Sequence, residues 1–219
     1  MEIKACIFDL DGVIVDTARY HFLAWKRLAE QLGINFTKAD NERLKGVSRM
    51  ESLDIILELG QLYPDEITKN EYAARKNEWY VEYISRMTPD EILPGVVDFI
   101  SELRGKGIKT AIGSASRNTP LILKRVGIDR LFDAVADGNS VSRAKPDPEV
   151  FLTAAKMLAV KPQNCVVFED AIAGIKAALN AGMRCVGIGE PEILSSAHLV
   201  VSGLAEMSLK RLTELKNKK

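Results

Sequence analysis

From residue 96 onward, short apolar runs alternate with longer stretches in which apolar residues recur every three or four positions. Short apolar runs are typical of buried parallel strands, and the recurring spacing is typical of helices packed against a sheet. Gly107, Gly127 and Gly182 follow such helical stretches, and glycine readily ends a helix. The pattern predicts strands at 108–113, 134–137, 165–168, 185–188 and 199–201, and helices at 96–104, 118–126, 148–158, 171–181 and 204–215.

A purely helical stretch separates this alternating region from the first strand, which an apolar run predicts at residues 3–8. Apolar residues at helical spacing predict further helices at 17–32, 49–59 and 65–87, and no convincing strand falls between residues 36 and 87. We therefore predict an α/β fold with a doubly wound parallel sheet, built from residues 1–16 and 89–219. Residues 17–88 are predicted to form an inserted, all-helical cap domain.

The first strand runs directly into Asp9 and Asp11, which are two positions apart and are followed by Gly12. Side chains alternate along a strand, so a turn at Gly12 can aim both carboxylates at one point. Two carboxylates this close repel each other unless a cation or a proton lies between them. The pair therefore predicts a metal site, or a nucleophile beside an acid/base. A plain acidic turn is the alternative.

Polar residues also follow two other predicted strands. The strand at 108–113 ends in Ser114-Ala115-Ser116-Arg117-Asn118, which offers hydroxyl and N–H groups to an anion or simply caps the next helix. Glu169 and Asp170 follow the strand at 165–168 and either complement the dipole of the next helix or join the first two aspartates. Such an oxygen-rich set suits Mg²⁺. Ligands of such sheets bind at the carboxyl ends of the strands, where we expect the site.

The segment Asp9-Leu10-Asp11-Gly12-Val13, together with Asp16-Thr17, resembles the first motif of the haloacid dehalogenase-like (HAD) phosphotransferases. The segment from Leu44 to Leu53 resembles the substrate-recognition loop of the β-phosphoglucomutase family, and the resemblance covers essentially the whole chain. It implies a Rossmann-like HAD core that uses Mg²⁺ as its cofactor.

The resemblance also implies roles for individual residues. Asp9 would be the nucleophile and Asp11 the acid/base, while Lys145, otherwise read as a surface lysine, would pair with the nucleophile. The implied catalytic set is Asp9, Asp11, Lys145, Ser114, Thr17 and His21. The implied metal set is Asp9, Asp11 through its backbone carbonyl, Glu169 and Asp170.

Substrate binding is implied mainly for residues of the predicted cap. Arg49 would hold the phosphate that is not transferred, because its planar fork suits a phosphate. Such mutases commonly have lysine at the position of Arg117, and arginine retains the positive charge. For His21 and Trp25, ordinary helix packing is the alternative. The implied substrate set is Trp25, Lys45, Gly46, Val47, Ser48, Arg49, Ser52, Lys76, Ser116, Arg117 and Asn118.

The function expected from this resemblance is interconversion of β-glucose 1-phosphate and glucose 6-phosphate, through an aspartyl-phosphate and glucose 1,6-bisphosphate. One alternative is a Mg²⁺-dependent sugar-phosphate phosphatase with the same core. Another is a phosphate-binding protein without catalysis, which is disfavoured because both Asp9 and Asp11 are present.

Charge and cysteine content limit the other partners. The chain has 219 residues, 30 basic and 30 acidic side chains and three cysteines without regular spacing. A formal net charge of zero argues against nucleic acid as a partner. The odd cysteine count indicates a reducing compartment without disulfides. With no leader or membrane-spanning run, we expect a cytoplasmic protein, and a monomer because the site needs one chain only.

Overall fold

The computed structural model describes residues 2–44 and 47–215. Within these residues, six parallel strands form one sheet in the order β3-β2-β1-β4-β5-β6. The central position of β1, between β2 and β4, brings the ends of three strands together. The strands are β1 (Ala5–Phe8), β2 (Lys109–Gly113), β3 (Ala134–Ala136), β4 (Cys165–Glu169), β5 (Arg184–Ile188) and β6 (Leu199–Val201).

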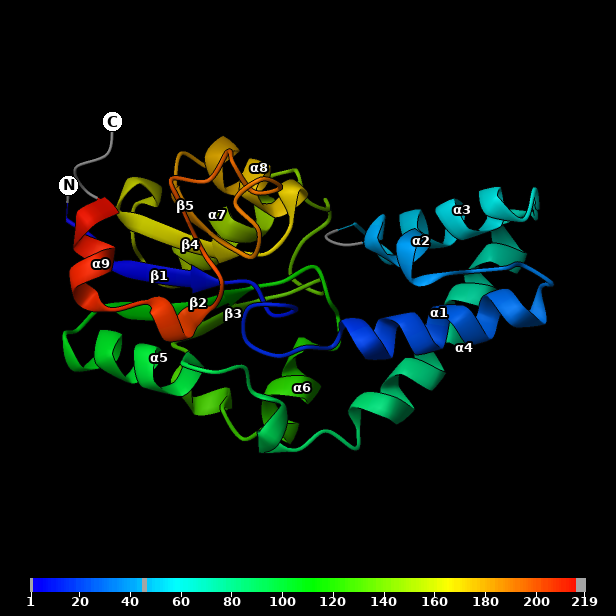
Figure 1. The fold of residues 1–219 in the computed structure, drawn as a ribbon, viewed down its shortest axis with the longest axis horizontal. Coiled ribbons are helices and arrows are strands. Elements are labelled where there is room, and N and C mark those ends of the chain that lie inside the picture. Colours follow the sequence, from blue (N-terminus) through cyan, green and yellow to red (C-terminus); the bar gives the residue numbers. More distant parts are fainter. Residues whose placement is uncertain (1, 45–46, 216–219) are drawn as a thin grey trace.

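Helices cover both faces of the sheet, as predicted (Figure 1). Alternate residues of β1 belong to different cores: Cys6 and Phe8 face one side, and Ala5 and Ile7 face the other. The first core includes side chains of α5 (Val96–Gly105), α6 (Thr119–Arg125) and α9 (Leu209–Glu214). The second includes side chains of α7 (Glu149–Met157) and α8 (Ile172–Asn180). The doubly wound parallel sheet is therefore confirmed.

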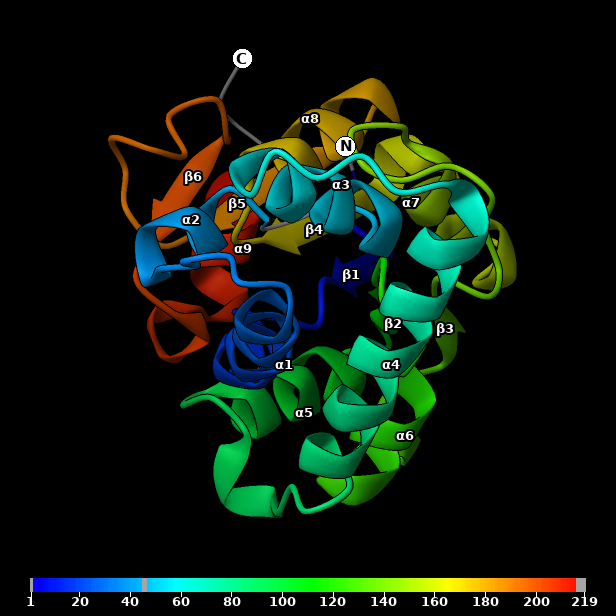
Figure 2. The same cartoon turned by 90° about the vertical axis from the view of Figure 1, so that its right-hand side faces the viewer.

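Four helices lie together beyond the carboxyl end of β1, at the right of Figure 1 and facing the viewer in Figure 2. We call them the helical layer: α1 (Ala18–Gln31), α2 (Lys38–Glu42), α3 (Arg49–Leu59) and α4 (Glu66–Ile84). Leu28, Leu53 and Ile56 belong to a separate apolar core of this layer. Tyr80 and Ile84 of α4 instead belong to one of the two sheet cores. The helical layer thus packs on the sheet core through one end of α4 and through Ala24 of α1.

The structure differs from the sequence prediction at two helices. Helix α2 was not predicted; it begins at Thr37, whose hydroxyl accepts from the N–H of Asp40 while the Asp40 carboxylate accepts from the N–H of Thr37. The single helix predicted at 204–215 is wrong: Leu204–Glu206 is a short 3₁₀ turn, and α9 begins only after Ser208. The Ser208 hydroxyl accepts from the N–H of Arg211 and so caps the new helix. Further 3₁₀ turns lie at Pro89–Glu91, Asp129–Leu131 and Pro162–Asn164.

Across the described part of the chain, the helices are too short or too polar for any of them to span a bilayer.

Candidate active site

Three central strands deliver the predicted acids and hydroxyls to one edge of the sheet. Asp9 directly follows β1, Ser114 directly follows β2, and Glu169 is the last residue of β4. The pairings of β1 with β2 and with β4 place these three strand ends side by side. All three side chains are buried: Asp9 is 6 % exposed, and Ser114 and Glu169 are each 1 % exposed. The sequence prediction that these residues come together is therefore confirmed.

Lys145 joins two of the acids. Its Nζ donates to Asp9 Oδ1 at 2.5 Å and to Glu169 Oε2 at 2.8 Å. Burial disfavours the charged ammonium, but the two carboxylates outweigh this effect, so the pKa of Lys145 is raised. Lys145 is 4 % exposed and is therefore not the surface lysine that its loop position alone would indicate.

Carboxylate oxygens of Asp9, Glu169 and Asp170 lie within 4.8 Å of one another. Three carboxylates and one ammonium leave two negative charges when all are ionised, and hard oxygen donors suit a divalent cation such as Mg²⁺. The Asp11 carboxylate is outside this cluster, so a side-chain role for Asp11 in metal binding has no support among the described residues. Binding through its backbone carbonyl stays a prediction.

The Asp11 carboxylate is instead held by Thr17, whose Oγ1 donates to Asp11 Oδ1. Burial and the neighbouring charge of Asp9 raise the pKa of Asp11 to about 8. A tight turn sets this geometry: Gly12 has a φ of 76°, and its N–H donates to the carbonyl of Val15. A Cβ at Gly12 would lie 2.2 Å from Asp170 Oδ2, so this position has no room for a side chain.

Lys76 of α4 lies inside a group of rings on the inner side of the helical layer. Its Nζ is 4.4 Å from the centre of the Trp25 ring and 4.8 Å from that of Tyr80. It also lies 3.0 Å from His21 Nδ1. Burial, with the charges of Lys76 and Arg49, lowers the pKa of His21 well below its ordinary value. The imidazole is therefore neutral at pH 7, and burial with the charge of Arg49 likewise lowers the pKa of Lys76 well below its ordinary value.

Two arginines converge from opposite sides of the site. Arg49 is the first residue of α3, and Arg117 lies in the loop after β2. Burial, and then the charge of Arg117, lower the pKa of Arg49. The nearby Asn118 amide, which belongs to the same loop as Arg117, is linked to Arg49 through Asn77 of α4. Two guanidinium groups close enough to repel each other favour an anion between them.

One cavity of about 470 Å³ is lined by nearly all of the predicted site residues. Among its walls are the acids, Lys145 and the loop after β2 on the sheet side, with Arg49 and Lys76 on the side of the helical layer. Of the predicted residues, Thr17 does not line it, and Lys45 and Gly46 lie outside the described residues. The others that line it are Asp11, His21, Trp25, Val47, Ser48, Ser52, Ser114, Ser116 and Asn118.

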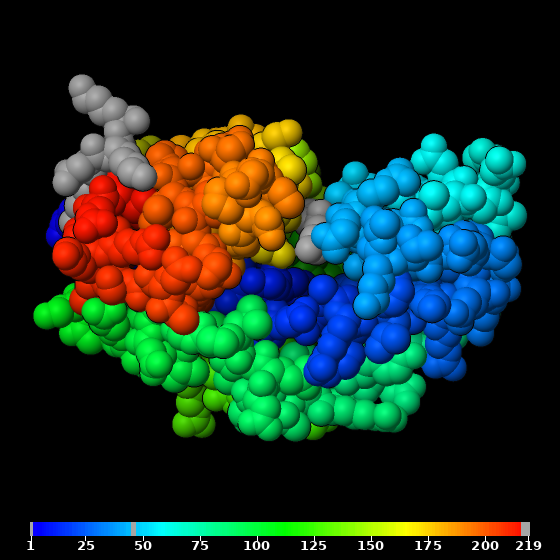
Figure 3. All heavy atoms as spheres, in the orientation of Figure 1, coloured from blue at the N-terminus to red at the C-terminus, as the bar shows by residue number. Residues whose placement is uncertain are grey.

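A second cavity of about 670 Å³ shares Gly12 and Asp170 with the first and extends between α2 and the segment after β5. Figure 3 shows the surface hollowed between these two parts, light blue and orange. Of the three acids, Asp170 therefore borders both cavities, whereas Asp9 and Glu169 border only the first.

Tyr80 and Asn77 line the first cavity but were not predicted as site residues. The spacing gave a signal, because Ala73, Lys76, Tyr80 and Ile84 recur every three or four positions along α4 and are all buried. A lysine on the buried face of a helix is unusual, and the polar residue beside it, Asn77, could have been chosen on that ground.

The sequence was compared with those of known proteins. The family described as haloacid dehalogenase-like hydrolase matches residues 3–182. The β-phosphoglucomutase of Bacillus subtilis is 47 % identical over 213 residues, which cover 96 % of this chain and 94 % of the relative. A phosphorylated carbohydrates phosphatase of Thermotoga maritima is 32 % identical over 183 residues, which cover 83 % and 82 % of the two chains.

A solved structure agrees with the sequence relatives. The crystal structure of β-phosphoglucomutase from Clostridium difficile superposes with a TM-score of 0.94 and 45 % identity, covering 98 % of this chain and 97 % of the other. The match extends over the sheet and the helical layer alike. The chain belongs to the haloacid dehalogenase-like hydrolase family and, within it, to the β-phosphoglucomutases.

Proposed function

We propose that the chain interconverts β-glucose 1-phosphate and glucose 6-phosphate through an aspartyl-phosphate and glucose 1,6-bisphosphate. The observation that carries this proposal is that one cavity offers two different places for a phosphate. One is the acidic cluster with Lys145, and the other is the pair of arginines with the loop after β2. A mutase needs both places at once, because its intermediate bears two phosphates.

Asp9 is the nucleophile of the proposed reaction. Lys145 fixes one of its oxygens and carries a positive charge next to the equatorial phosphoryl oxygens, where negative charge builds up. The Oγ of Ser114 accepts from the N–H of Ser116, so its own proton remains for a phosphoryl oxygen. Asp9, Asp170 and Glu169 would hold Mg²⁺, which would supply further neutralisation of the phosphoryl charge.

Asp11 moves the proton. Its raised pKa keeps it protonated at neutral pH, so it can donate to the sugar oxygen that leaves phosphorus as Asp9 attacks. When the phosphoryl group passes from Asp9 to the sugar, Asp11 takes the proton of the sugar hydroxyl that attacks the aspartyl-phosphate. The Thr17 hydroxyl holds the Asp11 carboxylate in place during both steps.

In the proposed reaction, the helical layer acts as a cap over the carboxyl ends of the strands. Arg49, Ser116, Arg117 and Asn118 hold the phosphate that is not reacting, while Lys76, His21 and Trp25 line the space for the sugar. After the first transfer the bisphosphate turns around, so that each phosphate occupies both places in turn. A closed layer keeps water from the aspartyl-phosphate and so favours transfer to the sugar.

A second candidate function is hydrolysis of a sugar phosphate. It is favoured by the similarity to the phosphorylated carbohydrates phosphatase of Thermotoga maritima. The same nucleophile, acid and metal residues would serve it, with water in place of the sugar hydroxyl.

The deciding experiment supplies Mg²⁺, β-glucose 1-phosphate and a trace of glucose 1,6-bisphosphate, and follows glucose 6-phosphate and free phosphate together. We expect glucose 6-phosphate with little free phosphate from the wild type, and no product from Asp9→Asn, which lacks the nucleophile. Free phosphate without glucose 6-phosphate would overturn the mutase and leave the phosphatase.

A further inference from the structure

Asn77 lies in the middle of α4, one residue after Lys76, and is half-buried at the wall of the first cavity. Its Oδ1 accepts from Arg49 Nη2 at 2.8 Å and from Asn118 Nδ2 at 3.0 Å. Arg49 belongs to α3 of the helical layer, whereas Asn118 follows β2 of the sheet. One oxygen atom therefore connects the two sides of the cavity.

The atoms of this contact are fixed by chemistry. A guanidinium only donates hydrogen bonds, so the Asn77 atom facing Arg49 is its carbonyl oxygen. The same oxygen then requires a donor from Asn118, which is its NH₂ group. Two donors from different elements thus meet at one acceptor, as they would at one oxygen of a phosphate.

The Asn118 side chain contacts Asn77 and does not cap its own helix. It stands at the N-cap position of α6, where asparagine usually accepts from the first turn of the helix, but its side chain makes no capping hydrogen bond. Its backbone N–H donates to Ser116 Oγ at 3.2 Å, which keeps the loop folded. The Asn118 amide is turned toward the helical layer instead of its own helix.

The charge of the acceptor matters as well. Among the ion pairs of the described residues, none involves Arg49, whose guanidinium is partly buried beside Arg117. A neutral amide holds this guanidinium without cancelling its charge, which remains available to a dianionic phosphate. A carboxylate in the same place would hold it more strongly but would repel the phosphate.

We propose that Asn77 is a positioning residue that holds Arg49 and Asn118 together at the second phosphate place through its single carbonyl oxygen. The proposal rests on the proposed function, because it concerns the phosphate that does not react. It makes Asn77 a determinant of how tightly a sugar phosphate is held at that place and of how well the helical layer aligns with the loop after β2.

The test compares Asn77→Ala and Asn77→Asp with the wild type. Glu78→Ala is the control, because Glu78 directly follows Asn77 on α4, is exposed and does not line the first cavity. Binding of glucose 6-phosphate and of inorganic phosphate is measured by calorimetry in Asp9→Asn chains, which cannot form the aspartyl-phosphate. KM, kcat and the thermal midpoint are measured in otherwise unchanged chains.

We expect Asn77→Ala to bind glucose 6-phosphate roughly tenfold more weakly, equivalent to about 1.4 kcal/mol, since Arg49 and Asn118 lose the acceptor that holds them. We expect a rise in KM of similar size. Asn77→Asp should bind glucose 6-phosphate at least as weakly as Asn77→Ala does. Its thermal midpoint should stay the same or rise, because the aspartate pairs with Arg49. A purely structural role would give the opposite result, with binding restored by aspartate.

Wild-type affinity in Asn77→Ala, or affinity equal to that of Glu78→Ala, would overturn the role of Asn77. Failure of the proposed function gives a separate signal, namely the absence of isomerisation by the wild type. A phosphatase would still need its substrate phosphate to be held, and the binding measurements need no turnover, so they decide the role of Asn77 in either case.

Discussion

At the scale of single residues, the site depends on one buried ammonium group. Lys145 Nζ contacts Asp9 and Glu169, which come from different strands, and all three side chains are nearly inaccessible to solvent. Buried charges are stable only with partners, so each of the three depends on the others. The proposed nucleophile is thus held in place by a residue 136 positions away in sequence.

Replacing Lys145 with methionine should therefore destabilise the fold as well as stop the reaction. In EDTA at neutral pH, we expect Lys145→Met to lower the free energy of unfolding by about 3–5 kcal/mol, because Asp9 and Glu169 lose their cation. Added Mg²⁺ should restore part of the loss. Urea unfolding with EDTA and with Mg²⁺ measures both effects.

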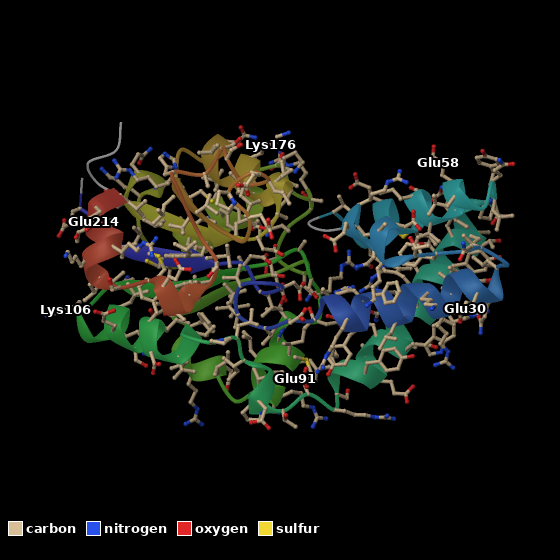
Figure 4. All side chains as sticks on the ribbon, viewed as in Figure 1. Glu30, Glu58, Glu91, Lys106, Lys176 and Glu214 are labelled. Carbon is tan, nitrogen blue, oxygen red and sulfur yellow. The ribbon has the colours of Figure 1, made fainter. Side chains whose placement is uncertain are left out.

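The control is Lys176→Met on α8, where the labelled Lys176 lies at the outer surface (Figure 4). Its effect should stay within about 0.5 kcal/mol. If Lys145→Met were as stable as Lys176→Met in EDTA, the ion pairs of Lys145 would not matter to the fold.

At the scale of elements, α8 makes room for the acids that precede it. Glu169 ends β4, and its Oε1 accepts from the N–H of Ala171 just before the helix. Gly174 lies in the first turn of α8, and a Cβ there would be 2.0 Å from the Glu169 Cδ. The helix can approach the strand end this closely only because that position has no side chain.

Gly174→Ala should consequently destabilise the fold, although a change from glycine to alanine in a helix usually stabilises it. Alanine normally stabilises a helix relative to glycine by up to about 1 kcal/mol, but here we expect a loss of about 1–3 kcal/mol from the displaced Glu169. Gly105→Ala in α5, where nothing lies within 4 Å of the added atom, should give the ordinary gain. Thermal unfolding of both variants checks this, and a gain in both would contradict it.

Prediction from sequence was most successful for these elements. Apolar runs and helical spacing predicted the strands and most helices, because they report which face of an element is buried. It failed at α2 and α9, where hydroxyl caps at Thr37 and Ser208 decide where a short helix starts. The site residues at strand ends could be predicted because parallel strands end at one edge. For Asn77, helical spacing shows only that it lies beside the buried Lys76; its partners could not be predicted, since they come from α3 and from the loop after β2.

At the scale of the whole molecule, Glu91 ties together the two connections between the sheet and the helical layer. Its Oε2 accepts from Arg19 Nη2 at 2.6 Å and from Tyr20 Oη at 2.8 Å. Arg19 and Tyr20 begin the helical layer, and Glu91 follows it in the chain. Figure 4 shows Glu91 near the junction of the two parts, far from Glu30 and Glu58 at the outer end of the layer.

Removing the Glu91 contacts should change the ratio of the two products more than it changes the free energy of unfolding. We expect Glu91→Ala to lower the free energy of unfolding by only about 1 kcal/mol, because Arg19 is largely exposed. The proportion of free phosphate to glucose 6-phosphate should rise, because a layer that closes less firmly admits water to the aspartyl-phosphate. The coupled assay described above measures both products.

The control for Glu91 is Glu82→Ala, which breaks an exposed ion pair with Arg86 within the same region of the chain. It should leave the product ratio unchanged. Equal product ratios in Glu91→Ala and the wild type would show that this contact does not limit closure.

The sequence by itself determined the alternation of strands and helices, the apolar faces and the acids that end the central strands, because these depend on local spacing. Tertiary structure alone decided that Lys145 lies between Asp9 and Glu169, that the Asp11 carboxylate turns to Thr17, and that Asn77 joins Arg49 to Asn118. Except for Asp11 and Thr17, these partners are far apart in sequence. Their contacts depend on strand order and on how the helical layer packs on the sheet, which local patterns do not encode.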